Sequence, residues 1–159
     1  SSLMSRAVLV GMPGVGKSTI GRALAVAWEC DFIDLDDLLA DTLGVTSAEF
    51  LRDNGEDAFR VAEFNALRVA LTSDAVVSCG GGTPTYPASR ELLAKHPCVI
   101  WLDAPLATLV TRVAGGDRPL LGDRPAEALA HLDAQRRAYY EEVADFTVTT
   151  EASPSAVVE

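Results

Sequence analysis

The chain has 159 residues, of which 48% are hydrophobic and 23% are charged, and its formal net charge is −10 at pH 7. This length and composition suit one globular domain with a real core and argue against a disordered protein. The negative charge argues against a nucleic-acid partner, and the apolar runs are too short for a membrane helix. We therefore expect a single domain over residues 1–159, monomeric and cytoplasmic, with no nucleic-acid or membrane partner.

The cysteines and histidines suggest no chemistry of their own. Cys30, Cys79 and Cys98 are odd in number and widely spaced, so neither a disulfide framework nor a zinc site is indicated, and we expect buried thiols. His96 and His131 have no ligand pattern beside them, and we expect them at the surface or at helix ends, without a role.

The first expected strand, residues 7–10, is short and wholly apolar, which is typical of a central strand in a parallel sheet. It leads into GMPGVGKS, residues 11–18, which fits the phosphate-loop pattern G-x-x-x-x-G-K-[ST]. Glycines let such a loop point its N–H groups at a phosphate, and an expected helix over residues 17–28 adds the positive charge of its N-terminus. Lys17 would meet the β- and γ-phosphates and Ser18 would bind Mg²⁺. The pattern predicts a nucleoside triphosphate site, because a merely structural glycine turn would not need this strand–loop–helix context.

Carboxylates end the next expected strand, which begins at residue 31. Asp34 and Asp36 would fall at the carboxyl ends of the strands, where an open α/β sheet binds its ligands. If the chain is extended there, the two side chains point the same way, one toward Mg²⁺ and one toward an acceptor hydroxyl. Alternatively, Asp36 or Asp37 caps the next helix. Both interpretations stay open at this point.

Two helices are expected next. The sequence TSAE at residues 46–49 is a capping box that opens a short helix, which ends at Asn54-Gly55. The longer helix that follows is expected to bury the face formed by Phe59, Ala62, Ala66, Val69 and Ala70. Arg60 and Glu63 lie off that face, and their i,i+3 spacing fits either a simple helical ion pair or a functional pair.

Three consecutive glycines, Gly80, Gly81 and Gly82, follow a β-branched strand over residues 75–79. Three glycines destabilise regular structure, so we expect them where the backbone must approach a ligand closely. A flexible linker is the alternative, but a linker would not normally begin at the end of a buried strand.

The rest of the chain alternates helices and strands. We expect a helix over residues 86–95, a strand over 98–102 and a helix that opens at Asp103. Residues 115–125 have the composition of a mobile lid, and Arg118 in such a lid would help to exclude water and neutralise developing charge. A long helix over residues 125–143 and a short strand over 146–148 close the pattern.

Together these motifs resemble the shikimate kinase family, P-loop enzymes of the nucleoside-monophosphate-kinase-like group, over nearly the whole chain. The likeness rests on residues 11–21, Asp34-Leu35-Asp36, Gly55-Glu56, Phe59-Arg60, Glu63, residues 80–82, residues 118–121, Arg136, Tyr140 and Ala144-Asp145. The resemblance implies a three-layer α/β P-loop fold with a five-stranded parallel sheet flanked by helices. It also implies transfer of the ATP γ-phosphate to the 3-hydroxyl of shikimate, in chorismate and aromatic amino-acid biosynthesis, with Mg²⁺ as cofactor.

The resemblance assigns roles to individual residues. The catalytic residues would be Asp36, Lys17 and Arg118, and the metal site would be formed by Ser18 and Asp34. The shikimate site would be formed by Asp36, Arg60, Gly80, Gly81, Gly82 and Arg136, with the two arginines on the carboxylate. The ATP site would be formed by Gly14, Val15, Gly16, Lys17, Ser18, Thr19, Arg112 and Arg118, with Arg112 near adenine.

Some features leave alternatives. The lid is shorter than in some relatives, which affects the register of Arg112, and Arg137 beside Arg136 leaves a one-residue ambiguity. A gluconate kinase of the same fold is one rival, but two separated arginines suit a carboxylate-bearing acceptor. A non-catalytic ATP-binding regulatory module is another, and the intact motif residues argue against it.

Overall fold

The computed structural model describes residues 4–114 and 125–150. One sheet of five parallel strands has the order β2-β3-β1-β4-β5. The strands are β1 (Ala7–Val10), β2 (Asp31–Asp34), β3 (Ala75–Ser78), β4 (Val99–Asp103) and β5 (Phe146–Thr149). The five-stranded parallel sheet predicted from the sequence is therefore confirmed.

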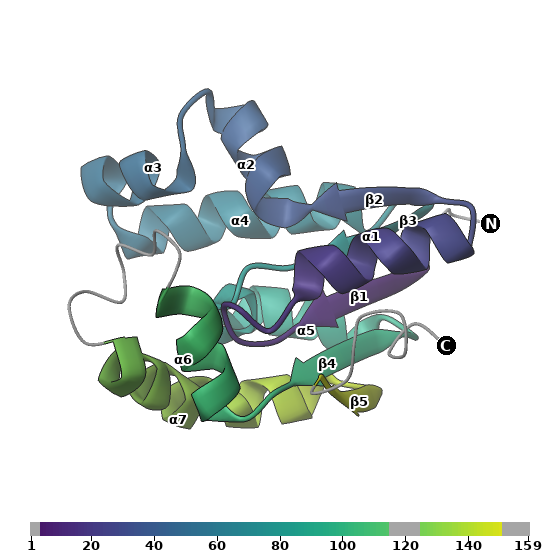
Figure 1. Ribbon diagram of the computed structural model, residues 1–159. Helices are drawn as coiled ribbons and strands as arrows, with labels where there is room; N and C mark the ends of the chain where they lie inside the picture. Colours follow the sequence, from purple (N-terminus) through teal and green to yellow (C-terminus); the bar gives the residue numbers. More distant parts are fainter. Residues whose placement is uncertain (1–3, 115–124, 151–159) are drawn as a thin grey trace.

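Helices cover both faces of this sheet. They are α1 (Lys17–Ala27), α2 (Leu35–Leu43), α3 (Ser47–Asn54), α4 (Glu56–Ala70), the 3₁₀ turn η1 (Thr83–Thr85), α5 (Pro87–Lys95), α6 (Leu106–Ala114) and α7 (Pro125–Val143). In Figure 1, α1 lies in front of the sheet while α4 and α5 lie behind it. This is the expected three-layer α/β arrangement. None of the helices in the described ranges is long and apolar enough to span a bilayer.

β1 is the central strand because both of its faces and both of its edges are covered. All four of its residues are fully buried, and it pairs with β3 on one side and β4 on the other. From β1 the chain crosses to β2 on one side of the sheet, whereas β3 connects to β4 on the other side. The carboxyl end of β1 is thus the point where the strand order reverses, and ligands bind at such a point in open α/β sheets.

The expectation for the buried face of α4 was partly wrong. Val69 is 60% exposed, whereas Glu63, which was placed off the apolar face, is only 1% exposed. Glu63 can be buried because Arg60 and the hydroxyl of Thr83 both donate to its carboxylate. Apolar periodicity alone could not find this position, since a paired carboxylate replaces an apolar side chain on the buried face.

The capping box predicted at the start of α3 is present in part. The Thr46 hydroxyl oxygen accepts the N–H of Glu49 at 3.1 Å, and the helix ends before Gly55, whose φ is +88°. The N-terminal cap of α2 is not one of the two residues suggested by the sequence. Asp34, rather than Asp36 or Asp37, is the capping residue, because β2 ends directly at the first turn of α2.

His96 lies at the C-terminal end of α5, which agrees with the expected helix-end position. Its side chain is buried rather than exposed. Its Nδ1 accepts the N–H of Cys98 at 3.0 Å, so Nε2 carries the proton and donates to the carbonyl of Ser5 at 2.8 Å. The ring therefore joins the segment before β1 to the segment before β4. All three cysteines are free thiols, with Cys79 buried and Cys30 and Cys98 partly buried.

Burial lowers the pKa of His96 below its ordinary value of 6.5. The unfolded chain therefore takes up a proton at a higher pH than the folded protein does, and the free energy of unfolding falls as the pH drops below about 6.5. We expect His96→Asn, which keeps an acceptor for Cys98, to lose less stability than the wild type between about pH 7.5 and about pH 5.5. Urea unfolding monitored by circular dichroism at both pH values measures this difference.

The matched control is His131→Asn, which removes an exposed histidine. It should keep the pH dependence of the wild type. If His96→Asn loses as much stability on acidification as the wild type does, His96 does not contribute to the pH dependence.

Candidate active site

The phosphate loop lies between β1 and α1. Gly11 passes so close to β4 that a Cβ there would lie 2.5 Å from the carbonyl oxygen of Leu102. Gly16, the residue before α1, has φ +101°, a conformation that glycine adopts without steric cost. In the part of the chain that the structure describes, no side chain caps the N-terminus of α1, and its first turn has no acidic residue. The N–H groups and partial positive charge of the helix are thus left for an anion such as a phosphate.

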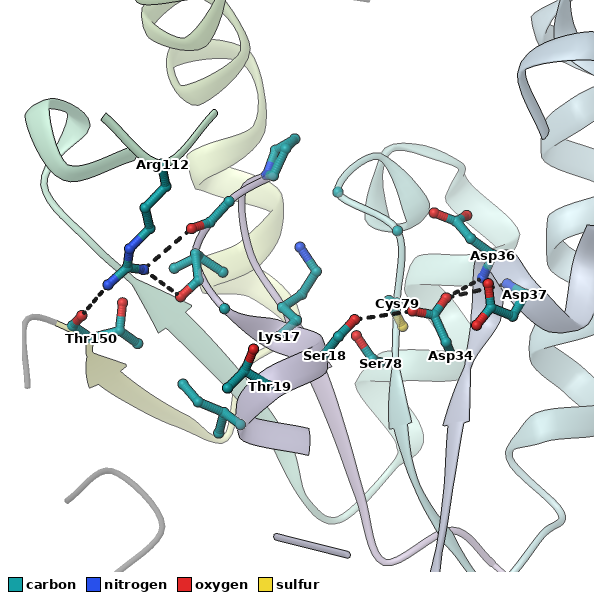
Figure 2. A pocket seen from close by; sticks show the side chains of 17 residues that line it. Lys17, Ser18, Thr19, Asp34, Asp36, Asp37, Ser78, Cys79, Arg112 and Thr150 are labelled. Carbon is teal, nitrogen blue, oxygen red and sulfur yellow. Dashed lines mark hydrogen bonds between the residues drawn. The ribbon is translucent and has the colours of Figure 1, made fainter. Parts of the chain in front are cut away.

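A cavity of about 630 Å³ opens beside this loop. Figure 2 shows Lys17, Ser18 and Thr19 on one side of it and Asp34, Asp36 and Asp37 on the other. Lys17 Nζ donates to the carbonyl oxygens of Gly11 at 2.6 Å and Met12 at 3.1 Å. The ammonium group is therefore held against the phosphate loop, next to the uncapped start of α1.

The carboxylate of Asp34 connects α1 to α2. Its Oδ1 accepts the N–H groups of Asp36 at 2.9 Å and Asp37 at 3.2 Å, and its Oδ2 accepts the hydroxyl of Ser18 at 3.0 Å. One side chain therefore caps α2 and also lines the cavity (Figure 2). Asp34 and Ser18 together present oxygen atoms to the cavity at the end of the phosphate loop, which are the donors that Mg²⁺ prefers.

Asp36 lies in the first turn of α2 rather than in an extended segment, so it does not repeat the orientation of Asp34 as the sequence suggested. The residue as a whole is exposed to solvent. The pKa of Asp36 is nevertheless raised, mainly because its carboxyl loses surrounding water and secondly because the negative charges of Asp34 and Glu63 lie near it. Its Oδ1 lies 3.3 Å from the position that a Cβ on Gly80 would take. A carboxyl with a raised pKa accepts a proton more readily than an ordinary one.

The glycine triplet, of which Gly80 and Gly81 line the cavity, lies against Arg60 of α4. A Cβ on Gly82 would overlap the guanidinium of Arg60, although the backbone of Gly82 has φ −93°, which any residue adopts. A side chain at this position would therefore displace the guanidinium of Arg60. Arg60 Nη1 donates to Glu63 Oε1 at 2.8 Å, and the side chain of Arg60 is only 14% exposed. Within the described residues, the buried Nε of Arg60 has no hydrogen-bond partner.

α7 reaches the triplet from the other side. The buried Tyr140 donates its hydroxyl to the carbonyl of Gly81 at 2.7 Å, and burial raises the pKa of this phenol to about 12. This bond fixes α7 against the glycines. One turn earlier, Arg136 Nη1 lies 3.0 Å from the position of a Cβ on Gly81. Arg60 and Arg136 therefore border neighbouring glycines of one loop.

A family model described as shikimate kinase matches residues 13–159 of this chain. The chain belongs to the shikimate kinase family. A shikimate kinase from Corynebacterium efficiens is 46% identical over 154 residues, which cover 95% of this chain and 90% of that protein. One from Mycobacterium avium is 43% identical over 157 residues, covering 96% and 89%. The solved structure of shikimate kinase from Acinetobacter baumannii in complex with shikimate has a TM-score of 0.88 and 32% identity, and covers 96% of this chain and 87% of that one.

Within this shikimate kinase fold, Arg136 and Arg137 point to different surroundings. Arg137 donates to Asp103 at 3.1 and 3.2 Å and to Asp133 at 3.2 and 3.4 Å, and it lies 5.0 Å from the centre of the Trp101 ring. The Asp103 hydrogen bond is the main reason that the pKa of Arg137 is raised. Arg137 therefore joins α7 to β4, which leaves Arg136 as the arginine beside the glycines.

Arg112 lies at the far end of the cavity from Asp36. Its Nη1 donates to the carbonyls of Gly14 at 3.2 Å and Val15 at 3.0 Å, and its Nη2 donates to Thr150 at 3.3 Å (Figure 2). The guanidinium thus joins α6 to the phosphate loop and to the end of β5. Arg118 and most of the predicted lid lie outside the described residues.

The sequence interpretation did not include Thr83 and Thr150 among the site residues. Thr83 is fully buried and donates its hydroxyl to Glu63 Oε2 at 2.9 Å. Thr150 lines the cavity, and its carbonyl oxygen accepts a hydrogen bond from Arg112. A threonine directly after three glycines was the available signal for Thr83, whereas Thr150 follows a short strand and carries no local signal at all.

The cap on α2 leads to a prediction of stability. Replacing Asp34 by Ala removes the acceptor for two backbone N–H groups, so we expect the free energy of unfolding to fall by about 1 kcal/mol. Asp34→Asn keeps a capping oxygen, so its free energy of unfolding should fall by less than that of Asp34→Ala. Urea unfolding of both variants tests this, with Thr46→Ala, which uncaps α3, as the comparison for an ordinary cap. A stability of Asp34→Ala equal to or above that of the wild type would show that repulsion from Asp36 and Asp37 outweighs the cap.

Proposed function

We propose that this chain transfers the γ-phosphate of ATP to the 3-hydroxyl of shikimate, yielding shikimate 3-phosphate and ADP. The observation that carries the proposal is that Arg60 and Arg136 lie against neighbouring glycines of one loop. The carboxyl of Asp36 lies against the first glycine of the same loop. Two planar guanidinium groups suit a carboxylate, and a carboxyl beside them suits a hydroxyl on the same small molecule. Membership in the shikimate kinase family supports this acceptor over gluconate and supports an enzyme over a non-catalytic module.

The triphosphate would lie against the uncapped N-terminus of α1. The N–H groups from Gly14 to Thr19 would bind its oxygens, and Lys17 would leave the loop carbonyls to meet the β- and γ-phosphates. The position of Arg112 between the phosphate loop and β5 supports a contact with the adenine end of ATP. Arg118 stays the predicted lid arginine.

The oxygen atoms of Ser18 and Asp34 fit Mg²⁺. Among the described residues there is no cluster of three or more His, Cys, Asp or Glu side chains that could hold a metal by itself. A site with one hydroxyl and one carboxylate suits Mg²⁺, which usually takes its remaining ligands from substrate phosphates and water. When bound, the ion would neutralise charge on the phosphates.

The chain's own residues would do the rest by positioning. Arg60 and Arg136 would hold the acceptor carboxylate, and the glycine backbone would let the ring approach the loop closely. Asp36 would orient the 3-hydroxyl and take its proton, a task that its raised pKa favours. The monomeric state and the cytoplasmic location stay predictions.

An assay of ADP release with Mg²⁺ and ATP tests the reaction. We expect turnover with shikimate and not with gluconate, a nucleoside monophosphate or water alone. Asp36→Asn should lower kcat by about 10²- to 10⁴-fold, the usual contribution of a positioned general base. The control is Asp41→Asn, an exposed carboxylate on the same helix, which should keep its activity.

Other outcomes of this assay would contradict specific parts of the proposal. Turnover with gluconate instead would contradict the acceptor while leaving the phosphate site intact. ATP binding without turnover would favour the regulatory module. Full activity of Asp36→Asn would mean that the hydroxyl needs no carboxylate base.

Arg60 gives a second test. Arg60→Ala removes a charge-assisted hydrogen bond to the acceptor carboxylate, so we expect the KM for shikimate to rise by about ten- to a hundredfold, with little change in the KM for ATP. Arg60→Lys keeps the charge next to Glu63 but loses the planar fork. Its KM for shikimate should lie between that of the wild type and that of Arg60→Ala. Steady-state kinetics with each substrate varied in turn measure both constants.

Arg68→Ala is the matched control, because it removes the same charge from an exposed position of the same helix. It should leave both KM values unchanged. Equal increases in the two KM values for Arg60→Ala would indicate a folding defect rather than a lost substrate contact.

A further inference from the structure

Glu63 is a carboxylate buried beside the cavity without being placed in contact with either substrate. Its side chain is 1% exposed, and among the residues that the structure describes each of its oxygens has one donor: Arg60 Nη1 on Oε1 and Thr83 Oγ1 on Oε2. A buried carboxylate is costly unless both oxygens are hydrogen-bonded. The position of Arg60 is therefore linked, through Glu63, to the hydroxyl of Thr83.

Thr83 is held in place by the backbone of the glycine loop. It is the first residue of η1, it is 0% exposed, and its N–H donates to the carbonyl of Gly80 at 3.1 Å. Its hydroxyl oxygen lies 3.4 Å from the position of a Cβ on Gly80. The glycine loop itself thus sets where the hydroxyl meets Glu63.

We propose that Thr83 is a positioning residue for acceptor binding, whose hydroxyl orients the carboxylate of Glu63 so that only one of its oxygens engages Arg60. This inference rests on the proposed function, in which Arg60 binds the carboxylate of shikimate. Thr83 touches neither substrate in this scheme and acts through Glu63.

The reason lies in the freedom of a carboxylate about its last torsion. The χ3 torsion of Glu is broad, so one hydrogen bond does not fix the plane of the group. The second bond, from Thr83, fixes that plane and occupies Oε2. Without the hydroxyl, Oε2 lacks its donor, and the guanidinium of Arg60 satisfies both oxygens as a bidentate pair. Arg60 then turns toward Glu63 and away from the acceptor.

Thr83→Val tests the inference, because valine keeps the shape of threonine and removes the hydroxyl. We expect the KM for shikimate to rise by about tenfold, with the KM for ATP within about twofold of the wild type, since one hydrogen bond to a charged group is lost. Thr83→Ser keeps the hydroxyl and should return the KM for shikimate to within about threefold of the wild type. A role in packing alone would predict the reverse order, because serine lacks the methyl group.

Ser89→Ala is the matched control. Ser89 is also fully buried, and its hydroxyl has no hydrogen-bond partner among the described residues, so removing it should leave all kinetic constants unchanged. A thermal melt of each variant shows that it is folded. A KM for shikimate in Thr83→Val within about twofold of the wild type, or one that Thr83→Ser fails to restore, overturns the inference.

Combining Thr83→Val with Arg60→Ala separates this inference from the proposed function. If Thr83 acts through Arg60, the valine change adds less than about twofold once Arg60 is absent. A large effect of Arg60→Ala with none of Thr83→Val contradicts the role of Thr83 alone. No effect of either change contradicts the carboxylate site as well, and absence of turnover with shikimate contradicts the proposed function and the inference together.

Discussion

The parallel pairing of β2, β3 and β1 is the constraint on which the site depends. Parallel strands end at one edge of the sheet, so the phosphate loop after β1, Asp34 at the end of β2 and the glycines after β3 are brought together from distant parts of the sequence. Each segment would be an unremarkable turn by itself. Their common edge makes one cavity, lined by the phosphate loop on one side and by the carboxylates after β2 and the glycines after β3 on the other.

Two carboxylates then hold this edge in place, and each uses both of its oxygens. Asp34 joins the backbone of α2 to the side chain of Ser18 on α1, and Glu63 joins Arg60 on α4 to Thr83 on η1. Each carboxylate therefore links two different elements of secondary structure. Such fully satisfied groups fix side-chain geometry more sharply than apolar packing does, because a hydrogen bond depends on direction as well as on distance.

The cavity carries cations within a molecule whose overall charge is negative. An overall charge of −10 opposes the approach of anionic substrates, whereas Lys17, Arg60 and Arg136 gather around the phosphate loop and the glycines. Screening weakens the field of distant surface charges over about a Debye length of 8 to 10 Å, so the nearby cations act on a bound anion more strongly than those distant charges do. The positions of the charges around the cavity therefore matter more for the binding of an anion than the net charge of the protein does.

The sequence by itself determined the sheet, the phosphate loop, the carboxylates at the end of β2 and the glycine triplet, because apolar runs, turn residues and loop patterns are local signals. It also pointed to Arg60 and Arg136, although only by resemblance to a family. The tertiary structure alone decided that Asp34 is the cap, that Glu63 and His96 are buried, and that Arg137 turns away from the glycines toward Asp103. These features depend on partners far apart in the chain, such as Ser5 with His96 and Thr83 with Glu63, and local patterns carry no information about such contacts.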